Sequence, residues 1–315
     1  MRIFRHDTVA AADRGAVVAI GNFDGVHLGH QAVIGEAGRI ARAGGLPHAV
    51  LTFEPHPRRV FRPDDPPFRL TPFRAKSRHI EALGVDLLFT LHFDLAFAQK
   101  SAEDFIATVL VRNLGLRHAV VGYDFVFSHQ RRGTAALLEA RGAELGFGVA
   151  VVDPIAASGG AVYSSTRIRE LLAAGKPREA AALLGRFWEI EGRVERGDAR
   201  GRTIGFPTAN LMLDDYLRPA AGVYAIRVGM EEGGRTLWHD GVANLGQRPT
   251  FGGSDLRLEA HLFDFDSDLY GRHLRVALVE HLRPERKFPG LDALRAQITE
   301  DAVQARTLLR DVPPP

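Results

Sequence analysis

The fold of the first half is decided by the stretch Ala16-Val17-Val18-Ala19-Ile20-Gly21-Asn22-Phe23-Asp24-Gly25-Val26-His27-Leu28-Gly29-His30. Its apolar run is typical of a buried strand, and apolar residues at helical spacing over residues 30–43 predict a helix after it. Between them, glycines recur at every fourth position and two histidines stand three apart. Glycine lets backbone N–H groups approach a ligand, a helix N-terminus attracts phosphate, and an imidazolium stabilises developing charge. The stretch therefore predicts phosphate chemistry at residues 21–30.

Two other interpretations of this stretch stay open. His27 or His30 could simply cap the helix that follows, as a lone histidine in a turn often does. Asp24, His27 and His30 could instead bind zinc. The spacing, the glycines and the position after a strand agree best with phosphate chemistry.

The rest of the first half alternates strands with helices. Further apolar runs predict strands at residues 49–53, 85–91, 119–122 and 149–153. Helices are expected after Ser101, over residues 134–145, and over residues 165–184 with a break at Gly175 and Pro177. This alternation predicts an α/β fold with a Rossmann-like, doubly wound parallel sheet. Its ligands should bind beyond the carboxyl ends of the strands.

The second half has a different pattern. The expected strands are residues 189–196, 209–213, 223–228, 237–243, 256–263 and 274–282, with no helices between them. A final segment, residues 291–309, places apolar residues on one face of a helix. These features predict a six-stranded antiparallel β-barrel followed by a C-terminal helix. We therefore expect two domains, residues 1–185 and 186–315.

Composition excludes several classes of protein. The chain has 315 residues, of which 45% are hydrophobic and 25% are charged, and it has no cysteine. Disulfides, thiolate nucleophiles and cysteine-bound zinc are therefore excluded. The first twelve residues contain no apolar run, and no window of 18 apolar residues occurs, so we expect neither a signal peptide nor a membrane span. The composition predicts a cytoplasmic protein with no membrane partner.

The cations are almost all arginine. Only Lys76, Lys100, Lys176 and Lys287 are lysines, and none stands in G-x-x-x-x-G-K-[ST], so the chain has no P-loop. Arginine suits phosphate binding, although a general bias of composition explains most of these residues equally well. The formal net charge is only +2.

Three more segments extend the first motif. They are Thr52-Phe53-Glu54-Pro55-His56-Pro57, Val121-Gly122-Tyr123-Asp124-Phe125-Val126-Phe127 and Ser164-Ser165-Thr166-Arg167-Ile168-Arg169. In this order, over residues 16–175, they resemble the H-x-G-H nucleotidylyltransferases, and most closely the FMN adenylyltransferase half of prokaryotic FAD synthetases. Two departures are Ser128, where the family usually has glycine, and Val162, where many members have a basic residue.

The resemblance implies a direct displacement. The FMN phosphate attacks the α-phosphorus of ATP, with Mg²⁺, and pyrophosphate leaves. His27 and His30 would stabilise charge on the phosphates, and Asp124 would lie on the flavin side. The implied ATP-binding residues are Gly21, Asn22, Phe23, Asp24, Gly25, Ser164, Ser165, Thr166 and Arg169, the last three of which hold the pyrophosphate.

A second glycine-rich stretch begins the other half. It reads Gly197-Asp198-Ala199-Arg200-Gly201-Arg202-Thr203-Ile204-Gly205-Phe206-Pro207-Thr208-Ala209-Asn210. On a strand, Thr208 and Asn210 point to the same face, and such an oxygen pair can hold Mg²⁺ and phosphate oxygens. A long barrel loop whose polar side chains bind only backbone is the alternative, and spacing alone does not decide between them.

The strand expected at residues 256–263 carries a carboxylate of interest. Leu256, Leu258, Ala260 and Leu262 alternate with Arg257, Glu259, His261 and Phe263, so the two sets occupy opposite faces. Glu259 could be a solvated partner of an arginine, or a general base toward a hydroxyl.

This half resembles riboflavin kinase over residues 186–310, with Pro207-Thr208-Ala209-Asn210 as the most specific block. A small departure is Ser267, where glycine is usual. The resemblance implies that Thr208 and Asn210 are Mg²⁺ ligands and that Glu259 activates the ribityl hydroxyl. The implied ATP-binding residues are Gly197, Gly201, Arg202, Gly205, Pro207, Thr208 and Asn210, and the implied flavin-binding residues are Asn244 and Arg286.

Together the two resemblances imply ATP-dependent conversion of riboflavin to FMN and then to FAD. One alternative keeps the first fold but adenylylates another phosphorylated precursor. This alternative fits poorly, because the kinase-like half would produce FMN, which is the substrate that the resemblance implies for the first half. Another alternative is nucleic-acid binding, which requires aromatics alternating with arginine across a barrel face. The 2 tryptophans and 5 tyrosines are too few for that, so we expect no nucleic-acid partner.

Overall fold

The computed structural model describes residues 1–6, 8–155, 162–196, 205–250 and 253–314. The chain divides into two compact units. The first comprises Met1–Pro66 and Thr71–Ser164, and the second comprises Pro67–Leu70 and Ser165–Pro315. The helices α7 (Ser165–Ala173) and α8 (Pro177–Leu184) thus belong to the second unit. The boundary expected near residue 185 stays a prediction.

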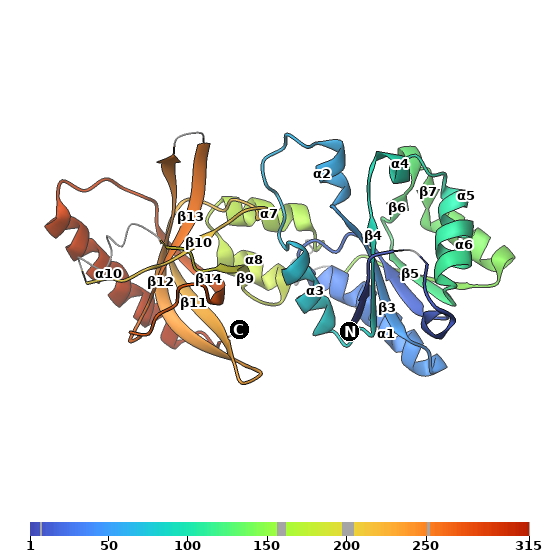
Figure 1. Cartoon of the computed structure of the whole chain (residues 1–315), viewed down its shortest axis with the longest axis horizontal. Coiled ribbons are helices and arrows are strands. Elements are labelled where there is room, and N and C mark those ends of the chain that lie inside the picture. Colours follow the sequence, from blue (N-terminus) through green and yellow to red (C-terminus); the bar gives the residue numbers. More distant parts are fainter. Residues whose placement is uncertain (7, 156–161, 197–204, 251–252, 315) are drawn as a thin grey trace. The chain divides into compact units, whose positions relative to one another are not determined.

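The first unit is built on a six-stranded parallel sheet with strand order β1-β4-β3-β2-β5-β8 (Figure 1). The strands are β1 (Arg2–Phe4), β2 (Val17–Ile20), β3 (His48–Glu54), β4 (Leu87–His92), β5 (His118–Gly122) and β8 (Gly148–Val152). The order reverses between β2 and β5, and ligands of such sheets bind at the carboxyl ends beside that switch. The predicted doubly wound sheet is confirmed.

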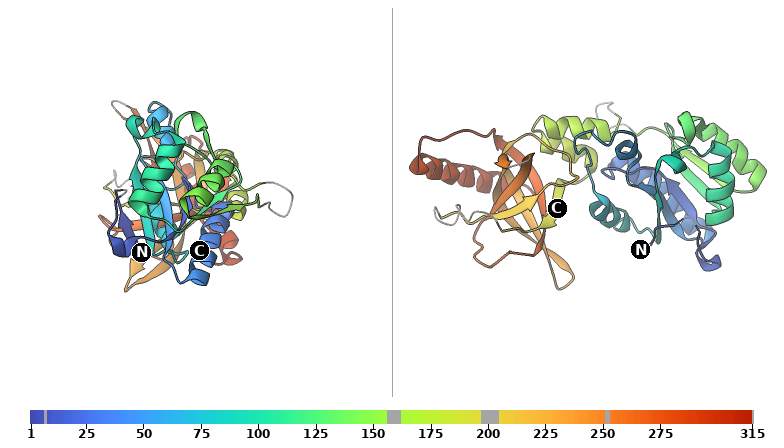
Figure 2. Two further views of the ribbon diagram at one scale, coloured as in Figure 1. Left: turned by 90° about the vertical axis from the view of Figure 1, so that its right-hand side faces the viewer. Right: turned by 45° about the horizontal axis from the view of Figure 1, so that its top comes forward.

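Helices cover both faces of this sheet (Figure 2). On one face α1 (Leu28–Gly44) and α3 (Phe73–Glu81) contribute to a core with alternate strand residues. On the other face η2 (Phe105–Leu114), which is π-helical, and α6 (Ala135–Leu145) contribute to a second core. Because both faces of the sheet are buried, the sequences of its strands are continuous apolar runs and do not alternate with polar residues.

Short elements complete the first unit. They are η1 (Ala11–Asp13), α2 (Pro57–Phe61), α4 (Leu95–Ala98), α5 (Ala102–Asp104), η3 (His129–Arg131) and the hairpin of β6 (Val126–Phe127) and β7 (Gly133–Thr134). The predicted cap at Ser101 is confirmed, because its hydroxyl accepts the backbone N–H of Asp104 at 3.0 Å. Strand β1 was not predicted, since it spans three residues and forms by pairing with β4.

The second unit is a six-stranded antiparallel sheet with order β10-β13-β12-β11-β14-β9. Its strands are β9 (Trp188–Arg193), β10 (Ala209–Met212), β11 (Gly222–Glu232), β12 (Arg235–Thr250), β13 (Gly253–Leu262) and β14 (His273–Arg283). A bridge between Glu195 and Asn210 brings the chain after β9 back to β10 and nearly closes the barrel. The predicted barrel is confirmed.

The C-terminal helix α10 (Leu291–Arg310) packs on the barrel through its second half. Ala305 and Leu309 are buried in a core with residues of β11 and β12, whereas Leu291 is 68% exposed. The apolar face expected along the whole helix is therefore covered only toward its end. In the described part of the chain, no helix is long and apolar enough to cross a membrane.

Candidate active sites

The chain between β2 and α1 has an unusual backbone. Phe23, Gly25 and Val26 adopt φ values of 48°, 90° and 42°. Glycine takes such values at no steric cost, but a β-branched residue such as Val26 does so only under strain. Strained conformations of this kind persist where the surroundings over-determine them, and they are concentrated at functional sites.

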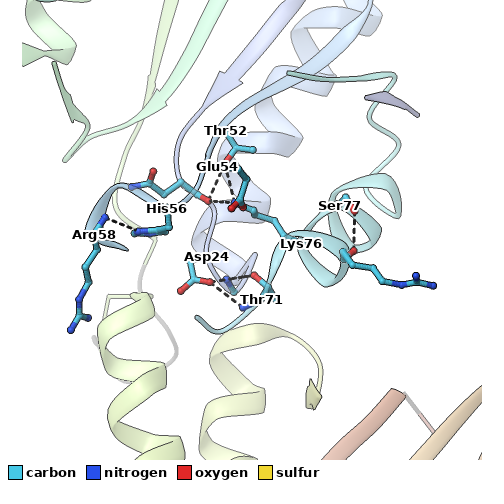
Figure 3. A network of polar contacts seen from close by, with 11 residues as sticks. Asp24, Thr52, Glu54, His56, Arg58, Thr71, Lys76 and Ser77 are labelled. Carbon is cyan, nitrogen blue, oxygen red and sulfur yellow. Dashed lines mark hydrogen bonds and ion pairs between the residues drawn. The ribbon is translucent and has the colours of Figure 1, made fainter. Parts of the chain in front are cut away.

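Side chains from a distant segment hold this loop (Figure 3). Asp24 is 2% exposed, and its Oδ1 accepts the backbone N–H of Thr71 at 3.0 Å and the Thr71 hydroxyl at 3.4 Å. The backbone N–H of Gly25 in turn donates to Thr71 Oγ1 at 2.8 Å. The Lys76 ammonium contacts the carbonyl oxygen of Asn22 at 3.3 Å. The loop is thus fixed by residues that sequence reasoning did not single out.

The two histidines form one compact group. His27 is 5% exposed and caps α1, because its Nδ1 accepts the backbone N–H of His30 at 3.3 Å. The two rings stack with centroids 3.6 Å apart, and the Phe23 ring meets His30 edge-on at 5.3 Å. A Cβ at Gly29 would lie 3.2 Å from the His27 ring, so glycine permits this packing. The capping alternative is therefore correct for His27, and it places both imidazoles at a helix N-terminus.

The zinc alternative finds no support in the geometry. The Asp24 carboxylate is engaged by Thr71, and His27 Nδ1 is engaged by the His30 backbone. Among the described residues, no group of three or more His, Asp or Glu side chains comes together in an arrangement that could hold a metal ion.

The predicted pyrophosphate segment lies at the beginning of α7. Ser164 precedes the helix, Ser165 and Thr166 form its first turn, and Arg169 follows one turn later. The Arg169 side chain donates from Nε to the carbonyl oxygen of Phe68 at 2.9 Å, and its guanidinium lies 5.6 Å from the Phe68 ring. The division of the chain assigns residues 165–169 to the second unit and residues 21–30 to the first. Their action on one nucleotide stays a prediction.

The flavin-side segment follows β5. Asp124 is exposed, and Phe125 and Phe127 stack with centroids 5.2 Å apart. Ser128, one of the departures from the family pattern, has φ 63° and ψ −175°. This region of conformational space is essentially restricted to glycine, which explains physically why glycine is usual at that position. Val162, the second departure, is exposed.

In the barrel, strand pairing aligns three polar residues. Asn210 of β10 is directly opposite Glu259 of β13, and Glu259 is directly opposite Asn244 of β12. Directly paired residues share one face of a sheet, with Cβ atoms about 4.5–5.5 Å apart. Asn210 is 6% exposed, and its Oδ1 is buried without a hydrogen-bond partner in the described part of the chain. We call Asn210, Glu259 and Asn244 the polar row.

Neighbouring residues hold the predicted Pro207–Asn210 block beside this row. The carbonyl oxygen of Pro207 lies 2.9 Å from Nδ1 of His261, two positions after Glu259 on β13. Thr208 lies directly before β10, which begins at Ala209 as expected, and is half-buried. Gly205 has φ 85°, a conformation that favours glycine. The predicted residues Gly197, Gly201 and Arg202 lie outside the described residues.

The segment after β14 reaches the polar row. Asn244 donates from Nδ2 to Glu285 Oε1 at 3.1 Å, and a Cβ at Gly246 would lie only 2.1 Å from that oxygen. Arg286 is exposed, with its guanidinium 4.9 Å from the Phe288 ring. Ser267, the departure from the family pattern in this half, lies in a bend between β13 and β14. The contact between Glu285 and Asn244 was not predicted, because nothing in the local sequence pattern brings the two residues together.

Comparison with known proteins separates the same two halves. The FAD synthetase family model matches residues 9–167, and the riboflavin kinase family model matches residues 184–309. Both predicted resemblances are therefore confirmed.

Relatives match the chain along nearly its whole length. A bifunctional riboflavin kinase/FMN adenylyltransferase of Escherichia coli K12 is 42% identical over 97% of both chains. The protein of the same name from Bacillus subtilis is 38% identical over 95% of this chain and 94% of its own. A crystal structure described as a macrolide-efflux protein from Streptococcus pneumoniae is similar at TM-score 0.85, with 32% identity and 99% of each chain covered. The more similar curated relatives decide the assignment: this chain belongs to the bifunctional riboflavin kinase/FMN adenylyltransferase family.

Proposed function

We propose that the two activities of this enzyme occur at two separate sites, which together convert riboflavin to FMN and then FMN to FAD. The polar row on the barrel serves the kinase reaction. The loop at residues 21–25 with His27 and His30 serves adenylyl transfer. The observation that supports two sites best is that the loop at residues 21–25 and the polar row belong to different units and are held by different residues.

At the kinase site Glu259 is the base. Its two cross-strand neighbours, Asn210 and Asn244, are neutral amides on the same face of the sheet. The carboxylate accepts the proton of the ribityl hydroxyl as that oxygen attacks the γ-phosphorus of ATP, and ADP leaves. Phosphoryl transfer otherwise requires mainly positioning and neutralisation of charge.

Magnesium fits the same site. The buried Oδ1 of Asn210, which has no hydrogen-bond partner among the described residues, is a hard oxygen donor of the kind that Mg²⁺ prefers. Thr208 supplies a hydroxyl two residues earlier. Bound there, the ion would neutralise charge on the transferred phosphates. Asn244, held by Glu285, and Arg286 are proposed to contact the flavin.

At the adenylyltransferase site no strong base is needed, because the attacking FMN phosphate is already ionised. The stacked imidazoles of His27 and His30 stabilise charge that develops on the ATP phosphates. Ser165, Thr166 and Arg169 hold the leaving pyrophosphate, with Ser164 beside them, and Asp124 faces the flavin. A cytoplasmic location and the lack of a nucleic-acid partner stay predictions.

The direct test is incubation with riboflavin, ATP and Mg²⁺, followed by chromatographic separation of FMN and FAD. We expect FMN first and FAD afterwards, with both absent when EDTA removes the metal. Formation of FMN without FAD, even when FMN is supplied in excess, would refute the adenylyltransferase half. RNA binding with a steep dependence on salt and no ATP turnover would refute both.

A further inference from the structure

Lys76 is a fully buried lysine of α3 that no motif of the chain includes (Figure 3). Its Nζ lies 2.8 Å from Glu54 Oε1 and 3.2 Å from the Thr52 hydroxyl, both at the carboxyl end of β3. The same Nζ lies 3.3 Å from the carbonyl oxygen of Asn22, in the loop after β2. One ammonium group therefore connects α3, the end of β3 and the loop that follows β2.

The contact with Asn22 is more than a way to bury a charge. A buried ion pair contributes little net stability, because desolvation of its two charges offsets their attraction. Glu54 alone would compensate the charge of Lys76. The Asn22 carbonyl nevertheless receives two donors, Lys76 Nζ and the Thr52 hydroxyl at 3.2 Å. The effect of Lys76 is therefore expected in the geometry of the loop.

That geometry follows from the planarity of the peptide. In a trans peptide the C=O and N–H groups point in opposite directions. Holding the Asn22 carbonyl toward Lys76 therefore directs the N–H of Phe23 away from it. At the other end of the loop, Thr71 holds the Asp24 carboxylate and accepts the N–H of Gly25. Residues 71 and 76 thus fix both ends of a loop in which Phe23, Gly25 and Val26 have positive φ.

We propose that Lys76 and Thr71 are positioning residues for FMN adenylyl transfer, which hold the loop of residues 22–25 so that the backbone N–H of Phe23 is oriented for the ATP phosphates before ATP binds. This inference rests on the proposed assignment of residues 21–30 to the ATP site. Donors that are oriented in advance need no reorganisation in the transition state, so their loss lowers kcat.

The principal test is the double variant Lys76→Met/Glu54→Gln, which removes both charges together. Adenylylation of FMN should fall about 10²-fold at saturating ATP, the scale of a misplaced reacting group. Riboflavin phosphorylation by the same protein should not change, because the barrel site does not contain these residues. Lys176→Met, which removes an exposed lysine paired with Glu179, is the matched control and should leave both activities normal. Wild-type adenylylation by the double variant would show that Lys76 only neutralises Glu54, and would overturn the proposal.

Thr71 allows a second test that leaves the buried pair of Lys76 and Glu54 intact. Thr71→Val removes the hydroxyl that accepts Gly25 N–H, whereas Thr71→Ser retains it. We expect Thr71→Val to lower kcat for adenylylation about 5- to 10-fold, the effect of one net hydrogen bond, and Thr71→Ser to stay near wild type. Equal activity of the two variants would contradict the proposal even if the Lys76 variant failed to fold.

His30→Ala in the same assay separates this inference from the site assignment. Normal adenylylation by His30→Ala would refute the assignment of the ATP site itself. A loss in His30→Ala with no loss in Lys76→Met/Glu54→Gln or Thr71→Val would refute only the positioning role.

Discussion

The adenylyltransferase loop and the polar row of the barrel are positioned in different ways. In the loop, backbone groups at Asn22 and Gly25 are held by side chains that lie 54 and 46 residues further along the chain. In the barrel, Asn210, Glu259 and Asn244 come together because three strands pair in register. A strand determines the direction of its side chains through its own alternation. A strained loop has no such rule, and its shape depends on what packs against it.

If the two sites act independently, a fragment that contains only the barrel should retain the kinase activity. Residues 186–315 expressed alone should form FMN from riboflavin and ATP, and should form no FAD. Chromatography of both flavins after incubation with ATP and Mg²⁺ measures this. A well-folded fragment without kinase activity would show that the barrel site borrows residues from the rest of the chain.

The same fragment also allows a test of stability, because it lacks residues 67–70 and 165–185 of the second unit. Helix α8 packs on β9 and β14, where Arg178 and Glu280 form an ion pair at 2.5 Å. Trp188 donates its indole N–H to the carbonyl of Leu70 at 2.8 Å. Because the fragment lacks Leu70, this buried donor is left unpaired in it, at a cost of about 1–3 kcal/mol. Residues 165–315 should therefore melt at a higher temperature than residues 186–315, and both below the kinase unit of the full chain.

The next largest effect concerns Glu259 of the polar row. Glu259→Gln retains the shape of the side chain and removes the base, so FMN formation should fall about 10²- to 10⁴-fold. Binding of riboflavin and of Mg·ATP should change little, and adenylylation of supplied FMN should stay normal. Steady-state kinetics of both reactions measure this. Full kinase activity of Glu259→Gln would contradict the assignment of Glu259 as the base. His261, whose ring contacts the Pro207 carbonyl, would then be the next candidate for the base.

In the loop site, His30→Ala should lower FAD formation from FMN about 10²-fold, the scale of one lost electrostatic donor. Riboflavin phosphorylation should be unaffected. Added zinc should not restore the variant, and a zinc-specific chelator should not inhibit the wild type. One equivalent of zinc in purified protein that disappears in the variant would instead support a metal site.

The smallest expected effect tests strain in a loop of the first unit. Ser128→Gly should stabilise the protein by about 1 kcal/mol, because Ser128 has a conformation that only glycine adopts without cost. Ser77→Gly is the matched control, since Ser77 lies within α3 and glycine there should destabilise by a similar amount. Thermal melting of the two variants measures both effects. A lower melting temperature for Ser128→Gly would mean that the Ser128 side chain contributes contacts that outweigh the strain.

Much of the fold could be predicted from the sequence. Apolar runs marked the central strands of both units, and polar residues at Ser101 and Thr134 marked helix starts, where both hydroxyls accept a backbone N–H. These signals are local, because alternation and capping involve neighbours within a few residues. Edge strand β1 was missed, since its three residues form a strand only by pairing with β4.

Within the two sites, the sequence by itself determined which residue types occupy the loop of residues 21–25 and on which face of its strand Glu259 lies. Only the tertiary structure decided that Glu259 stands between Asn210 and Asn244, because register is a property of paired strands and not of one strand. It also decided that Lys76 and Thr71 hold the strained loop. Those contacts join residues about fifty positions apart, and no local pattern of one chain segment specifies which distant side chain will reach its backbone.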